Sequence, residues 1–347
     1  FVTFKETEEG KTPVALTIGA SAFKNCSALA ELKLPTRLTF IGASAFYACD
    51  GIESVDIPEG VTSIGDLAFS NCDGLVSVSL PSTLTTLSIS TASSTKGAMA
   101  IFDSSSSLAY ITIKTSTVKT STGETVEKVN EAYAAEDNIL YAIAAKKDKD
   151  GNIVKDSNGK TVYIKTKLLY CPERKAGATD IEIPDTVTEV LPRAFERNKV
   201  VTSIRFADAE KFTIGSQAFY NCAQLASVSL PAGLGEIANS MFESCLKLTE
   251  VTIPYTVATI QNKAFYFCKN LSTVNFAPTP AGKTPVSLVV AAASGSLYSP
   301  FSACPSVKTI TFPERTTVIG KYAFGNSGPY QGIESVSLPS TLTQIGD

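Results

Sequence analysis

The stretch 64–72 (IGDLAFSNC), followed by 75–81 (LVSVSLP), is one copy of a pattern that recurs from one end of the chain to the other. We write the pattern as IGxxAFxxC and LxSVxLP. Its aromatic residue stands at Phe23, Phe46, Phe69, Phe195, Phe219, Phe242, Phe265 and Phe324, with looser copies at Phe102 and Phe301. The best-preserved neighbouring copies are 23 residues apart. A short fixed period of this kind is typical of a solenoid, in which each repeat packs on its neighbours.

Each repeat is predicted to contain two extended segments and one helical segment. In LxSVxLP apolar and polar residues alternate, which indicates a β-strand, and the proline ends that strand because it has no N–H for a ladder. Thr62–Ile64 is a second short extended segment, and Gly65 permits a tight turn after it. Asp66–Cys72 is predicted as short helical turns, because its apolar residues group on one side of a helix. We therefore predict an α/β solenoid with a parallel β-sheet on one face and short helical turns on the other.

The whole chain, residues 1–347, is expected to form a single solenoid of about 23-residue repeats. Residues 277–299 are expected to form an expanded coil that contains GKTPV, a sequence that also occurs at 10–14. We interpret the two copies as a longer repeat variant. They are not phosphate-binding loops, because both lack the earlier glycine that GxxxxGK[ST] requires.

Residues 114–180 depart most from the pattern. Asn138–Ala145 and Thr161–Tyr170 are strand-like and are predicted to pair as a β-hairpin insertion, with a polar tip at 146–160. Asp148, Asp150 and Asn152 within the tip are spaced as in a calcium loop. However, Ile153 stands where an EF-hand loop requires glycine, so we favour a solvated hairpin tip and keep calcium binding as the alternative.

Seven of the eight cysteines stand three residues after the repeat Phe, namely Cys26, Cys49, Cys72, Cys222, Cys245, Cys268 and Cys304. A residue type that follows the repeat register is expected to be a packing residue, so we predict buried free thiols. Bridges between stacked cysteines and a metal ladder are the alternatives, although no CxxC spacing supports a metal. Cys171 lies outside this register, and we select it as the candidate reactive thiol.

Composition argues against several functional classes. The chain has no histidine, which excludes Ser-His-Asp and Cys-His catalysis and Cys/His zinc fingers. A net charge of −3 without a basic stripe does not favour nucleic acid as a partner. No apolar run approaches the ~20 residues that span a bilayer. We predict a protein that is not an enzyme, with no catalytic residues, cofactor or metal; Asp180 and Glu182 could serve as paired carboxylates, but they lie two apart on an open strand.

The full pattern LxSVxLPxxLTxIGxxAFxxC resembles the BspA-like (Treponema-type) leucine-rich repeats of bacterial surface proteins. Clean copies stand at 29–49, 52–72, 225–245 and 248–268, and the 139–172 hairpin looks like an element common in that family. The resemblance implies a right-handed leucine-rich repeat superhelix. It also implies export to the cell surface or secretion, and a role in adhesion to host or neighbouring cells. A signal peptide and an anchor are expected outside this chain.

The outward positions of the predicted sheet form two columns. The first column is Glu31, Ser54, Ser77, Tyr110, Asp180, Ser203, Ser227, Glu250, Thr273, Thr309 and Ser335. The second column is Lys33, Asp56, Ser79, Thr112, Glu182, Arg205, Ser229, Thr252, Asn275, Thr311 and Ser337. Most members are Ser or Thr, as on any solvated sheet face. Because Tyr and Arg dominate binding hot spots, we select Tyr110, Asp180, Glu182 and Arg205 as candidate partner-binding residues.

The sequence thus predicts a non-enzymatic binding or adhesion module, monomeric, that recognises an unidentified protein or glycan through the solenoid surface. A structural spacer that presents another domain is the alternative. The hairpin tip is a rival site because loops on rigid scaffolds often carry function. Tyr47, Tyr220, Tyr266 and Phe267 follow the repeat Phe and either cover the coil edge or stack on sugars.

Overall fold

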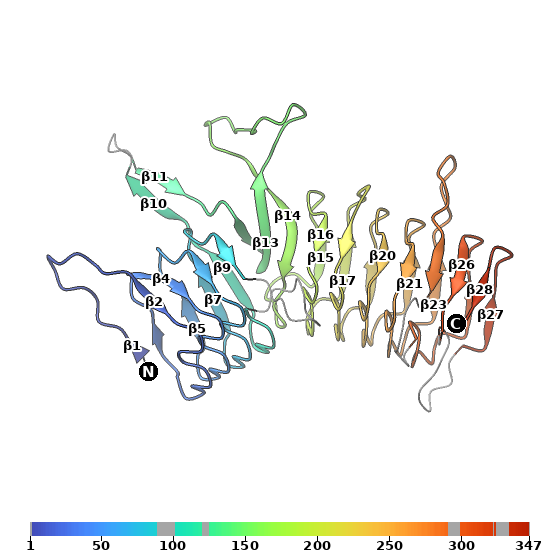
Figure 1. Cartoon of the computed structure of the whole chain (residues 1–347), viewed down its shortest axis with the longest axis horizontal. Coiled ribbons are helices and arrows are strands. Elements are labelled where there is room, and N and C mark those ends of the chain that lie inside the picture. Colours follow the sequence, from blue (N-terminus) through green and yellow to red (C-terminus); the bar gives the residue numbers. More distant parts are fainter. Residues whose placement is uncertain are drawn as a thin grey trace. The chain divides into compact units, whose positions relative to one another are not determined.

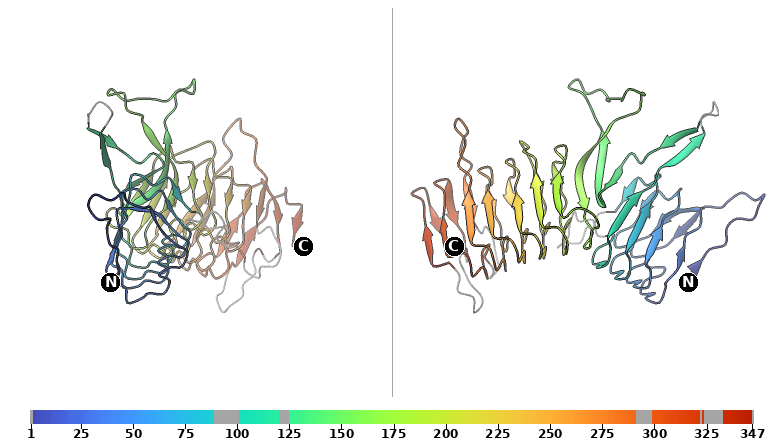
Figure 2. Two further views of the ribbon diagram at one scale, coloured as in Figure 1. Left: turned by 60° about the vertical axis from the view of Figure 1, so that its left-hand side comes forward. Right: turned by 180° about the vertical axis from the view of Figure 1, so that it is seen from behind.

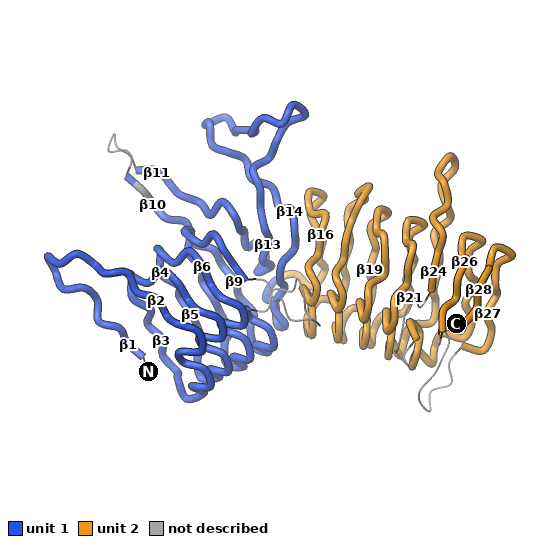
Figure 3. Tube along the Cα trace, viewed as in Figure 1, with its two compact units in different colours: residues 1–177 blue, residues 178–347 orange. Residues whose placement is uncertain are grey.

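The computed structural model describes residues 2–88, 101–119, 125–290, 299–321, 323 and 333–346. The chain divides into two compact units, residues 1–177 and 178–347 (Figure 3). Each unit is a parallel β-solenoid whose coils stack side by side (Figure 1). The predicted solenoid is therefore confirmed for each unit taken by itself. Phe324 and residues 291–298 of the expected expanded coil lie outside the described residues.

The LxSVxLP segments form the first strand of each coil, and these strands pair in parallel with their neighbours. In unit 1 they are β1 (Val2–Thr3) with β3 (Leu32–Lys33), and β5 (Ser54–Asp56) with β7 (Ser77–Leu80) and β9 (Tyr110–Ile113). In unit 2 they are β15 (Asp180–Ile183) with β17 (Ser203–Phe206) and β19 (Ser227–Ser229), β21 (Glu250–Ile253) with β23 (Thr273–Phe276), and β25 (Thr309–Thr311) with β27 (Ser335–Ser337).

The short extended segment before the repeat glycine forms the second strand of each coil. In unit 1 these strands are β2 (Leu16–Ile18), β4 (Leu38–Ile41), β6 (Ser63–Ile64) and β8 (Thr86–Leu87). In unit 2 they are β16 (Glu189–Val190) with β18 (Thr213–Ile214), and β20 (Glu236–Ile237), β22 (Thr259–Ile260), β24 (Leu288–Val290), β26 (Thr316–Ile319) and β28 (Gln344–Ile345). Each unit therefore carries parallel strands on two sides of its coils.

The predicted helical turns are wrong: no helix occurs in the described parts of the chain. In one typical coil, Ala45 N–H bonds to the carbonyl of Gly42 (3.3 Å), whereas Phe46 N–H bonds to Ala68 of the next coil (2.9 Å). Two residues per turn, such as Ser44 and Ala48 with φ of 53° and 56°, adopt the left-handed region. The alternation gives every second N–H to a neighbouring coil, which a helix cannot do.

The spacing between coils explains why tight turns replace helices. Rings of the repeat Phe stack at 5.2 Å in the pairs Phe46–Phe69 and Phe219–Phe242. An α-helix with its side chains is ~10–12 Å across and does not fit at that separation. The repeat glycine follows from the same crowding, since a Cβ on Gly65 would lie 2.4 Å from the backbone nitrogen of Ala43.

The core of each unit is a stack of Phe rings with a ladder of thiols beside it. Cys72 Sγ donates to the carbonyl of Phe46 (3.1 Å) and Cys245 Sγ to that of Phe219 (3.2 Å). All eight cysteines are free thiols, and all except Cys26 are buried. The prediction of packed free thiols is confirmed, with Cys26 as an exposed member. Cys171 is buried as well, which argues against its selection as the candidate reactive thiol.

The predicted hairpin insertion is confirmed in unit 1. Strands β13 (Ile139–Ala145) and β14 (Tyr163–Tyr170) pair antiparallel, and β12 (Tyr133–Glu136) adds a third strand. Tyr170 anchors the base, because its hydroxyl donates to the carbonyl of Phe102 (3.2 Å). A second hairpin, β10 (Ser116–Lys119) with β11 (Thr125–Lys128), was not predicted. Both hairpins project from the stacked coils of unit 1 (Figures 1 and 2).

Candidate binding face

The outward columns of the first strands follow the predicted register. Asp180 lies beside Ser203 and then Ser227, and Glu182 lies beside Arg205 and then Ser229. The alternation of buried and exposed side chains in β15 and β17 leaves Asp180, Glu182 and Arg205 exposed and Ser203 half-buried. We name the exposed side of β15, β17 and β19 the β15–β19 face. It presents hydroxyls, two carboxylates and one guanidinium on a flat, hydrogen-bonded support.

Asp180 is held in place by Ser203 at the start of β17 and by Thr202 just before it. Its Oδ1 accepts hydrogen bonds from the hydroxyls of Ser203 (2.7 Å) and Thr202 (2.9 Å). These bonds, Ser203 first, and the positive charge of Arg205 keep the pKa of Asp180 below its usual value. The carboxylate is therefore a fixed, ionised acceptor on an open surface.

Arg205 offers a guanidinium to a partner. It lies opposite Glu182 in the ladder, yet the two described side chains form no ion pair within 4.0 Å. Charges on the outer face of unit 1 behave differently, since Lys114 pairs with Asp56 (2.5 Å) and Lys33 with Glu31 (2.7 Å). Unpaired guanidinium groups can form bidentate hydrogen bonds with an incoming carboxylate.

The structure brings three of the four candidate residues onto one face. Asp180, Glu182 and Arg205 share the β15–β19 face of unit 2. Tyr110 lies on β9 of unit 1, in register with Ser77, and 49% of its surface is exposed. Its ring is thus available for contact within its own unit, as predicted from its outward position.

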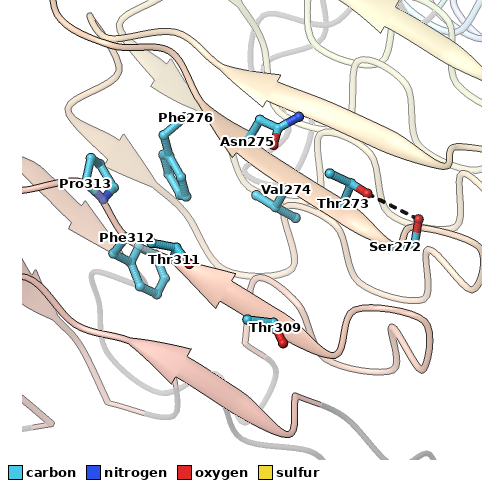
Figure 4. A pocket seen from close by; sticks show the side chains of 9 residues that line it. All are labelled: Ser272, Thr273, Val274, Asn275, Phe276, Thr309, Thr311, Phe312 and Pro313. Atoms are coloured by element: carbon cyan, nitrogen blue, oxygen red, sulfur yellow. Dashed lines mark hydrogen bonds between the residues drawn. The ribbon is translucent and has the colours of Figure 1, made fainter.

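A hollow of about 410 Å³ opens on the first-strand side of unit 2, between β23 and β25 (Figure 4). Its polar lining residues, Ser272, Thr273, Asn275, Thr309 and Thr311, come mostly from the predicted columns. Phe276, Phe312 and Pro313 also line it, and we did not select them from the sequence. The sequence did contain a signal for them. Phe276 and Phe312 stand at corresponding positions of two successive repeats, where the preceding strand β21 has Ile253.

In the hairpin tip, the carboxylates of Asp148 and Asp156 accept hydrogen bonds from backbone N–H groups of their own turns. Asp148 Oδ1 accepts from the N–H groups of Asp150 and Asn152, both at 2.9 Å. Asp156 Oδ1 accepts in the same way from Asn158 (2.8 Å) and Lys160 (3.0 Å). No cluster of three or more His, Cys, Asp or Glu side chains that could hold a metal occurs in the described part of the chain.

Lysines lie over three of the four aromatic residues that follow the repeat Phe, namely Tyr47, Tyr266 and Phe267. Lys24 Nζ lies 5.0 Å from the ring centre of Tyr47, and Lys269 Nζ lies 4.4 Å from that of Phe267. Tyr47 also accepts a hydrogen bond from Asn71 Nδ2 at its hydroxyl (3.0 Å). These contacts favour the interpretation that the rings cover the coil edge.

The described residues include no helix suited to crossing a bilayer.

Comparisons with known proteins agree with this geometry. A family model for the BspA-type leucine-rich repeat region matches in six copies, over residues 11–116, 170–281 and 298–347. The crystal structure of the pneumococcal vaccine antigen PcpA is similar, with 21% identity, a TM-score of 0.60, and coverage of 95% of this chain and 71% of that one. A search among curated proteins found no match.

A leucine-rich repeat protein from Eubacterium ventriosum is also similar, with 21% identity, a TM-score of 0.57, and coverage of 97% of this chain and 84% of that one. At this identity the two structures support the solenoid fold alone. The family model covers more than half of the chain, so this protein belongs to the family with BspA-type leucine-rich repeats.

Proposed function

We propose that this chain is a non-enzymatic binding module that recognises a protein partner through the outer face of its first strands. The β15–β19 face is the proposed centre, with Asp180 and Arg205 as the principal contacts and Glu182 beside them. Tyr110 is proposed as a further contact residue on unit 1. The observation that carries the proposal is the Arg205 guanidinium, which forms no ion pair within 4.0 Å in the described residues and lies near a carboxylate that its neighbours hold ionised.

The chemistry of the face supports a protein partner over a nucleic acid. The β15–β19 face carries one guanidinium, two carboxylates and several hydroxyls, so it has no basic stripe of the kind that binds phosphate backbones. A rigid ladder with a charged centre and a hydroxyl rim suits recognition by shape and many weak hydrogen bonds. We also propose that the module acts at the cell surface or after secretion, in keeping with PcpA, which is described as a vaccine antigen.

The test is binding of the purified chain to panels of extracellular matrix proteins and immobilised glycans. For any protein that binds, Arg205→Ala and Asp180→Asn are compared with wild type by biolayer interferometry. We expect Arg205→Ala to weaken binding at least about tenfold, the size expected at a hot spot. Ser335→Ala is the matched control. Ser335 is an exposed residue on β27 in the same outward column as Asp180, and its substitution should change the dissociation constant less than about twofold.

Two outcomes would count against the proposal. Binding that survives both substitutions would place the protein-binding site elsewhere, and the hairpin tip would be the next region to vary. The absence of any ligand in both panels would favour a spacer that presents another domain.

A further inference from the structure

The first-strand sheet of unit 2 is interrupted twice in the described residues, between β19 and β21 and between β23 and β25. At the second interruption the ladders are β21–β23 and β25–β27, and none joins β23 to β25. The same two coils remain paired on their other side, where Leu288 to Val290 of β24 bond to β26. The coils therefore stay stacked, and the first strands β23 and β25 are close neighbours that share no ladder in the described residues.

Both ends of this interruption are closed. Ser306 Oγ donates to the carbonyl of Lys269 (2.8 Å), just before the two strands begin. At the other end, the rings of Phe276 and Phe312 lie 5.5 Å apart, tilted by 47°. The hollow of about 410 Å³ is thus bounded by protein at each end and open to solvent. Figure 4 shows the two rings and Pro313 at one end, and Ser272 and Thr273 at the other.

The lining of the hollow carries no formal charge. Its polar side chains are hydroxyls and one amide, and each of these groups can both donate and accept hydrogen bonds. Within the described part of the chain, the side chains of Asn275, Thr309 and Thr311 bond to no other residue. All three are exposed, so their hydrogen-bonding capacity is open to a ligand.

This combination suits one class of ligand. A neutral pyranose presents alternating hydroxyl donors and acceptors at its rim and an apolar C–H face, which packs on an aromatic ring. An anion would find no counter-charge in the lining, and a purely apolar ligand would leave the hydroxyls and the amide without partners. The volume lies within the range of about 300–1,000 Å³ that is usual for small-molecule sites.

We propose that the hollow between β23 and β25 binds a neutral hexopyranose unit of a glycan. The sugar's C–H face packs on Phe276, which is half-buried, and its hydroxyls bond to Asn275, Thr309 and Thr311. This inference rests on the proposed binding function and adds a glycan site separate from the β15–β19 face. Each site can therefore fail without the other.

Saturation-transfer NMR on the full chain provides the test, with the methyl glycosides of glucose, galactose, mannose, N-acetylglucosamine and N-acetylgalactosamine as probes. We expect transfer to at least one glycoside, with a titratable dissociation constant. The double variant Thr309→Val, Thr311→Val keeps the side-chain shape and removes two hydroxyls, so binding should weaken at least about tenfold. Phe276→Ala should also weaken binding, through loss of the ring.

Thr252→Val is the matched control, because Thr252 lies in register with Asn275 on β21 but outside the hollow. It should bind the sugar as wild type does, and so should Arg205→Ala. Circular dichroism confirms that each variant is folded. The proposal is overturned if none of the five glycosides shows transfer. Undiminished binding by the folded double valine variant would overturn it equally.

Discussion

Arg315 donates through Nη1 to the carbonyl of Val286 at 3.2 Å, and Arg37 makes the same contact with Val14 at 3.1 Å. Both valines end a GKTPV sequence. In each case the arginine's own carbonyl accepts from the N–H two residues after the valine, at 2.8 Å for Leu288 and 2.9 Å for Leu16. The repeated sequence is therefore one structural device used twice, an extended coil held by an arginine from the next coil.

We predict that Arg315→Leu destabilises the protein much more than Arg37→Leu does. The buried guanidinium of Arg315 also donates to the carbonyls of Val257 (2.6 Å) and Pro254 (3.0 Å). Its removal leaves three carbonyls without these donors, which should cost about 2–4 kcal/mol. Arg37 is less buried, and its loss should cost about 1 kcal/mol or less. Urea unfolding followed by circular dichroism measures the stability of both variants. Equal shifts in the two urea midpoints would contradict the larger role given to Arg315.

Asn198 supports a second stability prediction. It stands where other repeats have cysteine, is fully buried, and accepts at Oδ1 from the N–H groups of Val200 (2.9 Å) and Val201 (2.7 Å). Asn198→Ala should cost about 2–4 kcal/mol, because one buried and one partly buried N–H lose their acceptor. Asn198→Cys restores the residue of the repeat but should not restore stability, since a thiol is a weak acceptor.

The comparison of Asn198→Cys with Asn198→Ala decides whether packing or capping dominates at this position. A cysteine variant as stable as wild type would show that filling the volume is sufficient. Ser227→Ala, an exposed change in the same unit, serves as the control and should stay within about 0.5 kcal/mol of wild type.

The solenoid, the first strands and the large hairpin could be predicted because their signals are periodic. Alternation in segments such as Ser77–Leu80 fixes which side chains face the core, and a shift of one residue would bury the polar set. The candidate residues on the β15–β19 face followed directly from that register. Their role in binding stays a prediction.

The turns could not be predicted because two conformations satisfy the same pattern. A helix and a tight turn both bring Ala68, Phe69 and Cys72 towards one side, and only the distance between coils excludes the helix. The hollow between β23 and β25 depends on the spacing of two neighbouring strands, which composition does not encode. The β10–β11 hairpin was missed because its eight strand residues carry few large apolar side chains.

Calcium should leave the melting temperature of the protein unchanged. Hydrogen bonds from N–H groups, that of Asn152 first, hold the pKa of Asp148 below its usual value of 3.8, so this carboxylate already has donors in place of a cation. A ligand that binds only the folded state raises the melting temperature with its concentration. Thermal unfolding in millimolar calcium and in chelator measures this, and a concentration-dependent rise would establish a metal site at the tip.

The same carboxylate predicts a local pH effect. Because the folded-state pKa of Asp148 is depressed, its contribution to the turn is present above pH 3.8 and is lost as the pH falls below that value. The protection factors of the Asp150 and Asn152 amides, which compare exchange with the intrinsic rate at the same pH, should therefore fall in acid and in Asp148→Ala at neutral pH. Asp156, which forms a matching turn, provides the internal comparison.

Burial of the cysteine thiols predicts that alkylation of the folded protein is selective for the exposed cysteine. The thiolate is the reactive form of cysteine, and burial raises the pKa of Cys49 to about 11 and that of Cys72 to about 12. Iodoacetamide at pH 8 should therefore modify Cys26 in the folded protein and the seven buried thiols only after denaturation. Peptide mass spectrometry reads the sites directly. Early modification of Cys171 would show that its surroundings open readily in solution.

The same shifts set the direction of an alkaline transition. Thiols of the unfolded chain ionise near pH 9.0, whereas burial raises the pKa of Cys72 and of Cys304 to about 12. Stability that depends on the protonated thiols is therefore complete below pH 9 and falls as the pH rises from 9 towards 12.

Ser105 already replaces cysteine in one coil, where its hydroxyl donates to the carbonyl of Phe69 (2.8 Å). A Cys72→Ser, Cys304→Ser variant should consequently fold and lose less stability between pH 9 and 11 than wild type does. An identical pH dependence of the two urea midpoints would mean that lysines and tyrosines, and not the ladder, govern the alkaline transition.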